Sequence, residues 1–266
     1  MQTFLQTEYL VYTKTFLINL NTMISVVLNV YKRPMMLEKQ IQAIKNQSVE
    51  IKSENIHVWY NNSDVPRYYP KDPLIKTYTC NWNTKFWGRF TIPLLIQTPF
   101  VAMFDDDILP QKDWFKNCME TIENPQTNGI LGGSGVILQQ KSYIPYNKAG
   151  WNGLHSDKTE RVDLVGHAWF YRQEWLKYLW YEKPYSVDNG EDIMFSYLAQ
   201  KYGNINTFVP KHPENNKELW CTDFNIASNV GSDDNASWRI GNHLELRGEI
   251  CAYAIDNGWK TINNIK

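Results

Sequence analysis

Three consecutive carboxylates, Asp105, Asp106 and Asp107, follow an uninterrupted apolar run at residues 100–104. Such a run is typical of a strand buried on both faces of a sheet. If the chain is still extended there, Asp105 and Asp107 lie on one side of the backbone and Asp106 on the other. Neighbouring carboxylates raise one another's pKa unless a cation neutralises them, which points to Mg²⁺ or Mn²⁺ held for a substrate phosphate. The alternative is a plain acidic turn leading into Pro110.

A second acidic pair, Glu191 and Asp192, begins an expected helix. The helix dipole stabilises carboxylates at this end, so a capping role alone would explain Asp192. The functional interpretation is that Asp192 faces a sugar. There it would act as the base for an acceptor hydroxyl or stabilise an oxocarbenium-like transition state.

A basic pair, His243 and Arg247, lies near the end of the chain. The two residues are four apart on an expected helix, so they share a face and could both contact a departing diphosphate. The alternative is a solvated arginine on an exposed helix face. Spacing alone leaves both interpretations open.

The elements that must position these residues alternate between strand and helix patterns, which predicts an α/β domain with helices on both sides of its sheet. The expected strands are residues 24–31, 56–60, 75–78, 100–104, 129–138 and 163–171. One expected helix begins at Pro34. The others cover residues 83–97 up to Pro93, 112–123, 173–181, 189–202 and 242–257. Asn242 and Glu245 form an expected capping box at the start of the last one. Residues 142–160 and 210–237 show no periodicity and are predicted to be loops.

In α/β domains of this kind, ligands bind at the carboxyl ends of the sheet strands. Arg33 and Asn61 follow the first two expected strands, as the three aspartates follow the strand at residues 100–104. We therefore expect all of them at one edge of the sheet.

The chain has 266 residues, which suits a single domain over residues 23–266, preceded by an extension at residues 1–22. A net charge of −1 argues against nucleic acid as a partner. The longest uncharged run, residues 15–31, is too short for a membrane span, and the first residues lack the basic start of a signal peptide. The four cysteines are widely spaced. These features predict a soluble cytoplasmic protein.

Taken in order, the motifs resemble the C-terminal glycosyltransferase domain of the exostosins and exostosin-like proteins, a retaining family of the GT-A fold. The similarity covers about residues 24–257. The matching segments are Val30-Tyr31-Lys32-Arg33, Val58-Trp59-Tyr60-Asn61-Asn62, Arg89, Phe104-Asp105-Asp106-Asp107, Leu164-Val165-Gly166-His167-Ala168-Trp169-Phe170, Asn189-Gly190-Glu191-Asp192-Ile193 and His243-x-x-x-Arg247-x-x-x-Cys251.

The resemblance implies a Rossmann-like nucleotide-diphospho-sugar transferase with a mixed sheet, which moves a sugar from a UDP donor to a glycan or glycoconjugate hydroxyl with retention. Arg33, Asn61 and Arg89 would hold the uridine nucleotide. Asp105 and Asp107 would anchor Mn²⁺, or Mg²⁺, together with the donor. Asp106 and His243 are further donor-site candidates.

For catalysis, the resemblance implies that Asp192 is the carboxylate at the sugar and that Arg247 lies on the diphosphate, with Glu191 beside them. This chain has Gly190 where the family has a cysteine, so the disulfide that the family would form with the position of Cys251 is absent. Retention could proceed through a glycosyl-enzyme intermediate or by attack on the leaving-group face.

Two other functions use similar residues. A nucleotidyltransferase acting on a sugar phosphate also needs paired carboxylates and metals, but it should have a phosphate-binding loop rich in glycine and basic residues after the first strand, where only Arg33 is found. A non-catalytic carbohydrate-binding domain would keep the aromatic residues without turnover.

Overall fold

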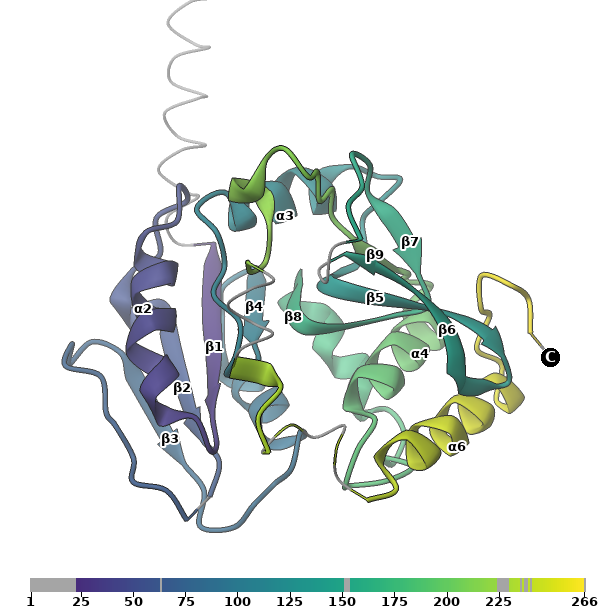
Figure 1. The fold of residues 1–266 in the computed structure, drawn as a ribbon, viewed down its shortest axis with the longest axis horizontal. Coiled ribbons are helices and arrows are strands. Elements are labelled where there is room, and N and C mark those ends of the chain that lie inside the picture. The colour runs from purple at the N-terminus through teal and green to yellow at the C-terminus, as the bar shows by residue number, and fades with distance from the viewer. Residues whose placement is uncertain are drawn as a thin grey trace, which may run out of the picture.

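The computed structural model describes residues 23–62, 64–150, 154–223, 230–234, 236, 239 and 241–265. Within this part of the chain, nine strands form one mixed sheet that is flanked by helices (Figure 1). The predicted α/β class is therefore confirmed. The predicted extension at residues 1–22 lies outside the described residues, and the division into an extension and one domain stays a prediction.

The first part of the chain builds a parallel sheet in which β1 is central. β1 (Ile24–Val30) pairs with β2 (Ile56–Tyr60) on one side and with β4 (Phe100–Phe104) on the other, and β3 (Lys76–Thr79) extends the sheet beyond β2. Pro34 begins a short 3₁₀ turn that continues as α2 (Leu37–Lys45). α2 packs against β1 through a buried face that includes Leu37, Ile41 and Ile44.

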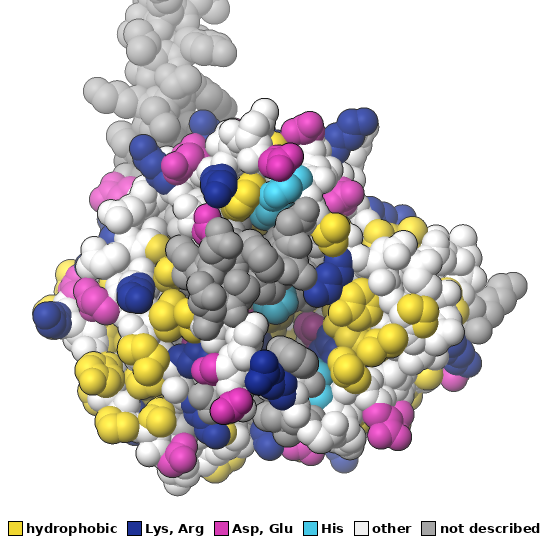
Figure 2. All heavy atoms as spheres, in the orientation of Figure 1, with side chains coloured by type: hydrophobic (Ala, Val, Ile, Leu, Met, Phe, Trp, Pro, Cys, Tyr) yellow, Lys and Arg dark blue, Asp and Glu magenta, His cyan; other side chains and the backbone are white. Residues whose placement is uncertain are grey.

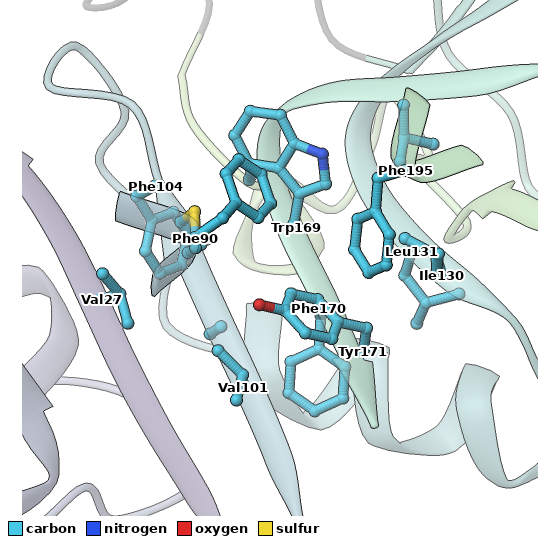
Figure 3. Close-up of a cluster of buried hydrophobic side chains, with 14 of the residues drawn as sticks. Val27, Phe90, Val101, Phe104, Ile130, Leu131, Trp169, Phe170, Tyr171 and Phe195 are labelled. Carbon is cyan, nitrogen blue, oxygen red and sulfur yellow. The ribbon is translucent and has the colours of Figure 1, made fainter. Parts of the chain in front are cut away.

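β4 lies at the centre of the core. All five residues from Phe100 to Phe104 are 0% exposed, which confirms the prediction of a strand buried on both faces. The Phe100 ring stacks on Phe170 with 5.5 Å between centroids, and Figure 3 shows part of the surrounding cluster. Each buried phenylalanine contributes roughly 1.5–3 kcal/mol of hydrophobic stabilisation. The acidic residues therefore follow directly after a strand that the core holds in place.

The second part of the chain adds antiparallel strands. β8 (Leu164–Arg172) pairs with β4, β5 (Ile130–Gln140) pairs with β8, and β6 (Ser142–Gly150) forms a hairpin with β5. β9 (Thr207–Val209) and β7 (Glu160–Val162) complete this side. The prediction of a loop over residues 142–160 is wrong for the residues of β6. Pairing with β5 and packing against α6 stabilise this strand, although its sequence shows no regular alternation of apolar and polar residues.

Most predicted helices are present. They are α3 (Trp114–Glu123), α4 (Glu191–Gly203), α6 (His243–Asp256) and a 3₁₀ helix at Gln173–Trp180. The helix expected over residues 83–97 is only a 3₁₀ helix, Gly88–Leu95, with Pro93 inside it. Asn242 precedes α6, but its side chain makes no capping hydrogen bond, so the prediction of a capping box is wrong. Among the described residues, no helix combines the length and the apolar character needed to cross a membrane.

The carboxyl ends of β1, β2 and β4 meet at one edge of the sheet, because these strands are parallel. Arg33, Asn61 and Asp105 follow these ends, as expected. β8 runs in the opposite direction, and its pairing of Ala168 with Phe104 places His167 beside Asp105. The Asp105 amide donates a hydrogen bond to the His167 carbonyl at 2.9 Å.

Candidate active site

A cluster of three possible metal ligands lies at the end of β4. Asp105, Asp107 and His167 each offer one ligand atom, and these atoms all lie within 4.8 Å of one another. The chain turns at Asp105, where the Ile108 amide donates a hydrogen bond to the Asp105 carbonyl at 3.2 Å. Asp105 and Asp107 are therefore brought together by a turn and not by the extended chain that the sequence suggested.

The electrostatics of this cluster fit a cation. Burial, together with the charges of Asp105 and Asp106, raises the pKa of Asp107 to about 7. Asp107 Oδ1 is buried and has no hydrogen-bond partner among the described residues. A divalent ion would supply both the missing partner and the missing positive charge.

The sequence patterns assign no functional role to His167, the third member of this cluster. Its Nδ1 lies 3.7 Å from Asp105 Oδ2, and its backbone φ of +65° is unusual for a residue other than glycine. No local pattern identifies this histidine, because only the register between β4 and β8 places it at the cluster.

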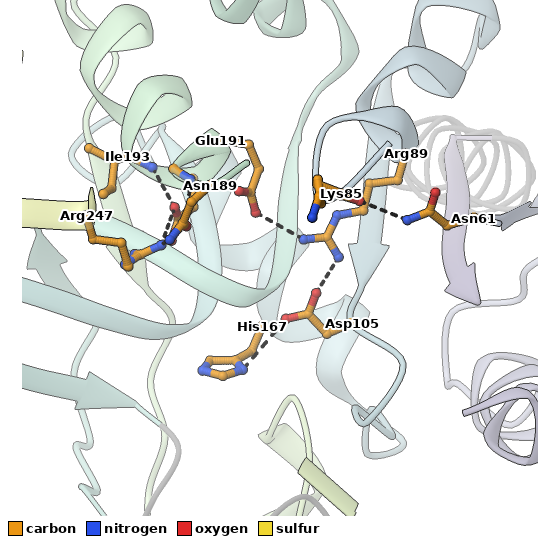
Figure 4. Close-up of polar contacts among 11 residues, drawn as sticks. Asn61, Lys85, Arg89, Asp105, His167, Asn189, Glu191, Ile193 and Arg247 are labelled. Carbon is orange, nitrogen blue, oxygen red and sulfur yellow. Dashed lines mark hydrogen bonds and ion pairs between the residues drawn. The ribbon is translucent and has the colours of Figure 1, made fainter. Parts of the chain in front are cut away.

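Arg89 connects the cluster of Asp105, Asp107 and His167 to the second acidic pair (Figure 4). Its guanidinium donates one hydrogen bond to Asp105 Oδ1 and another to Glu191 Oε1, the latter at 3.2 Å. It also lies over the Trp169 ring, 4.7 Å from the centroid, and is only 3% exposed. Burial disfavours its charge, but Asp105 and Glu191 outweigh this and raise the pKa of Arg89. Arg89 thus forms a buried bridge between two carboxylates, and its role in holding the nucleotide stays a prediction.

Arg33 and Asn61 lie at the predicted edge, and both have partners within the chain. Arg33 Nη1 donates to Asp106 Oδ1 at 2.6 Å. The Asn61 amide nitrogen donates to Asn83 Oδ1 at 2.8 Å, and its oxygen accepts from the Thr84 amide, also at 2.8 Å. Asn61 therefore fixes the loop that follows β3.

The second acidic pair lies at the start of α4. Gly190 adopts φ +86° before this helix, and a Cβ there would come within 2.3 Å of Ile250 Cδ1. Burial and the neighbouring Asp192 raise the pKa of Glu191 to about 7. Asp192 Oδ1 accepts a hydrogen bond from the Ile193 amide at 2.9 Å, while no side chain caps α4.

Arg247 is paired with Asp192. Its Nη1 and Nη2 donate to the two oxygens of Asp192 at 3.0 and 2.7 Å, and its guanidinium lies over the Tyr143 ring, 4.2 Å from the centroid. Burial alone would raise the pKa of Asp192, but the charge and hydrogen bonds of Arg247 outweigh it and hold this pKa below its ordinary value.

Asn189, a residue without an assigned role in the sequence, organises this half of the site. Its oxygen accepts from Arg247 Nη1 at 3.2 Å, and its nitrogen donates to His243 Nδ1 at 3.1 Å. His243 and Arg247 therefore do share a face of α6. Burial and the nearby Arg247 lower the pKa of His243 to about 4, so this histidine is neutral near pH 7.

Residues 25–180 match the model of the family described as "Glycosyl transferase family 2". The chain belongs to glycosyl transferase family 2. This family 2 match and the mixed sheet confirm the predicted GT-A fold. The finer resemblance to the exostosins is not supported. Membership in family 2 also favours glycosyl transfer over nucleotidyl transfer and over sugar binding without turnover.

Solved structures similar to this family 2 chain include three of Staphylococcus aureus TarS. TarS itself is 18% identical, with a TM-score of 0.47 over 71% of this chain and 35% of that one. TarS 1–349 is 17% identical, with a TM-score of 0.45 over 71% and 60% of the two chains. TarS 1–349 in complex with UDP-GlcNAc is 16% identical, with a TM-score of 0.46 over 73% and 60%. The aligned regions thus span 35 to 60% of these structures. No curated protein matches the sequence.

Proposed function

We propose that this family 2 glycosyltransferase depends on a divalent metal ion and moves a sugar from a UDP-sugar to a hydroxyl of a glycan or glycoconjugate. The observation that carries the proposal is the cluster of Asp105, Asp107 and His167, whose ligand atoms lie within 4.8 Å of one another. Arg89 links this cluster to the acidic pair at the start of α4. The metal side and the sugar side of one site would thus be adjacent.

Mn²⁺ is the ion that we propose for the cluster. Two carboxylates suit both Mg²⁺ and Mn²⁺, and Mn²⁺, as a transition metal, accepts the imidazole nitrogen of His167 more readily than Mg²⁺ does. When bound, the ion would neutralise the donor diphosphate and stabilise it as a leaving group.

Arg33 and Asn61 are the residues that we propose for the nucleotide side. Arg33 would contact a phosphate through the Nε and Nη2 edge of its guanidinium, which Asp106 does not use and which Asp233 contacts in this structure. Asn61 would act indirectly, by positioning the loop of residues 83–85.

Asp192 is the catalytic base in this proposal. It accepts the proton of the acceptor hydroxyl, whose oxygen attacks the anomeric carbon of the donor sugar. As that bond forms, the bond from the anomeric carbon to the diphosphate oxygen breaks, and UDP leaves with the electron pair. Arg247 keeps Asp192 ionised and oriented, and the hydroxyl becomes a stronger acid as its oxygen bonds to carbon.

This route gives inversion at the anomeric carbon. Retention was implied only by the exostosin resemblance. The anomeric configuration of the product, measured by NMR, tests this step: a product with the donor's configuration would refute the single displacement.

The experiment that tests the proposed function measures nucleotide release by the purified chain from UDP-, GDP- and CMP-sugars, with Mn²⁺ and a panel of saccharide acceptors. We expect acceptor-dependent release of UDP that EDTA abolishes, and none from an Asp107→Asn variant. Release of UMP or pyrophosphate would instead indicate nucleotidyl chemistry. Absence of release from every UDP-sugar would refute the proposal.

A further inference from the structure

Residues 230–234 lie against the proposed donor site from a part of the chain that is distant in sequence from β1 and β4. We call these residues the strap. The strap contacts the site at two points, Gly231 and Asp233, which contact Asp107 and Arg33 respectively. The strap also lies beyond residues 25–180, to which the family match is confined.

The first contact is made by backbone. A Cβ on Gly231 would lie 2.4 Å from Asp107 Oδ2. No side chain fits there unless Asp107 moves, so the strap backbone lies directly against a carboxylate of the metal cluster. A ligand that approached Asp107 from this side would have to displace the strap.

The second contact is an ion pair. Asp233 accepts hydrogen bonds from Arg33 Nε at 3.1 Å and from Nη2 at 2.7 Å. Together these atoms form the edge of a guanidinium that binds a carboxylate or a phosphate through two parallel hydrogen bonds. Asp106 already occupies Nη1 of the same group. A phosphate that used the paired edge of Arg33 would therefore have to replace Asp233.

We propose that the strap is a built-in competitor of the donor: Asp233 occupies the phosphate-binding edge of Arg33 and is released when a nucleoside diphosphate binds. This inference rests on the proposed function and adds a regulatory element to the same site. The side chains of Arg33 and Asp233 are 10% and 37% exposed. Because the pair is partly exposed, formation of the Arg33–Asp233 ion pair should weaken the apparent affinity for the donor by about three- to tenfold.

The experiment compares the wild-type chain with Asp233→Asn and with a matched control, Asp234→Asn. Asp234 is the next residue of the strap, and its exposed carboxylate contacts Arg239 at 3.4 Å. The affinity for UDP in the presence of Mn²⁺ is measured by titration calorimetry. Amide hydrogen exchange of the strap is measured without ligand. We expect Asp233→Asn to bind UDP about three- to tenfold more tightly and to exchange faster, and Asp234→Asn to match the wild type.

Equal or weaker UDP binding by Asp233→Asn would overturn the inference, because Asp233 would then not compete with the donor. If none of the three proteins binds UDP, the proposed function fails. Hydrogen exchange alone then tests whether the ion pair of Arg33 and Asp233 holds the strap against the site. In that case faster exchange in Asp233→Asn alone supports closure by the ion pair, whereas equal exchange in all three proteins refutes it.

Discussion

Arg247 holds both carboxylate oxygens of Asp192, at 3.0 and 2.7 Å, across the packing of α6 against α4. Both side chains are at most 10% exposed, so the pair lies out of bulk water. Two parallel hydrogen bonds fix the orientation of the carboxylate as well as its charge. In the proposed mechanism this contact lets Arg247 position Asp192, and a contact of Arg247 with the diphosphate stays a prediction.

Replacing Asp192 by asparagine should separate catalysis from donor binding. The amide keeps the shape of the side chain but cannot accept the acceptor proton, so turnover should fall about 10²- to 10⁴-fold. Binding of UDP with Mn²⁺ should stay within about twofold of the wild type. An exposed control, Asp256→Asn at the end of α6, should retain full turnover. Transfer by Asp192→Asn at the wild-type rate would remove Asp192 from the mechanism.

Replacing Arg247 by methionine should destabilise the fold in a pH-dependent way. Losing one partner of a buried ion pair costs about 3–5 kcal/mol, because the remaining charge is left uncompensated. Arg247 lowers the pKa of Asp192 in the folded state, so the stabilisation is present above the ordinary value of 3.8 and is lost as the pH falls through the lowered folded value.

Urea unfolding of the Arg247→Met variant from pH 7 to pH 3 measures this effect. The difference in unfolding free energy from the wild type should narrow below about pH 4. A surface control, Lys211→Met, removes an exposed pair with Glu120 and should cost no more than about 1 kcal/mol at any pH. A constant difference across the range would mean that Arg247 contributes packing alone.

Replacing His167 by alanine should change metal preference. Removing the nitrogen ligand leaves two carboxylates, which suit Mg²⁺ as well as Mn²⁺. Mn²⁺ affinity should fall at least about tenfold while Mg²⁺ affinity changes less, so the preference for Mn²⁺ should narrow. Calorimetric titration of each ion in the presence of UDP checks the ratio. His57→Ala, a buried histidine on β2, is the control for general loss of structure. An unchanged ratio would exclude His167 as a ligand.

Replacing Gly190 by alanine should destabilise the start of α4 through two separable causes. A positive φ costs roughly 1–2 kcal/mol for a residue with a Cβ, and the contact with Ile250 adds a steric cost. Gly258→Ala is the matched control, because Gly258 has φ +100° but a Cβ added there would meet no atom within 4 Å. Thermal unfolding should show the larger loss for Gly190→Ala. Equal losses would mean that Ile250 moves aside at little cost.

The sequence by itself determined the elements whose signal is local. The apolar run of β4 predicted a strand buried on both faces, and parallel order predicted that Arg33, Asn61 and Asp105 share one edge. The four-residue spacing of His243 and Arg247 predicted their common helix face. Burial and periodicity are properties of a short segment, so they can be read without knowing what packs against it.

Only the tertiary structure decided which polar groups meet. His167 contacts Asp105 because of the register between β4 and β8, and Arg247 contacts Asp192 because α6 packs against α4. β6 is a strand because β5 pairs with it and α6 packs against it. The contacts of His167 and Arg247 join residues far apart in the chain, and a charge is buried only where the fold supplies a partner for it. Sequence patterns name the candidates for such pairs, but the packing of the sheet and helices selects the partners.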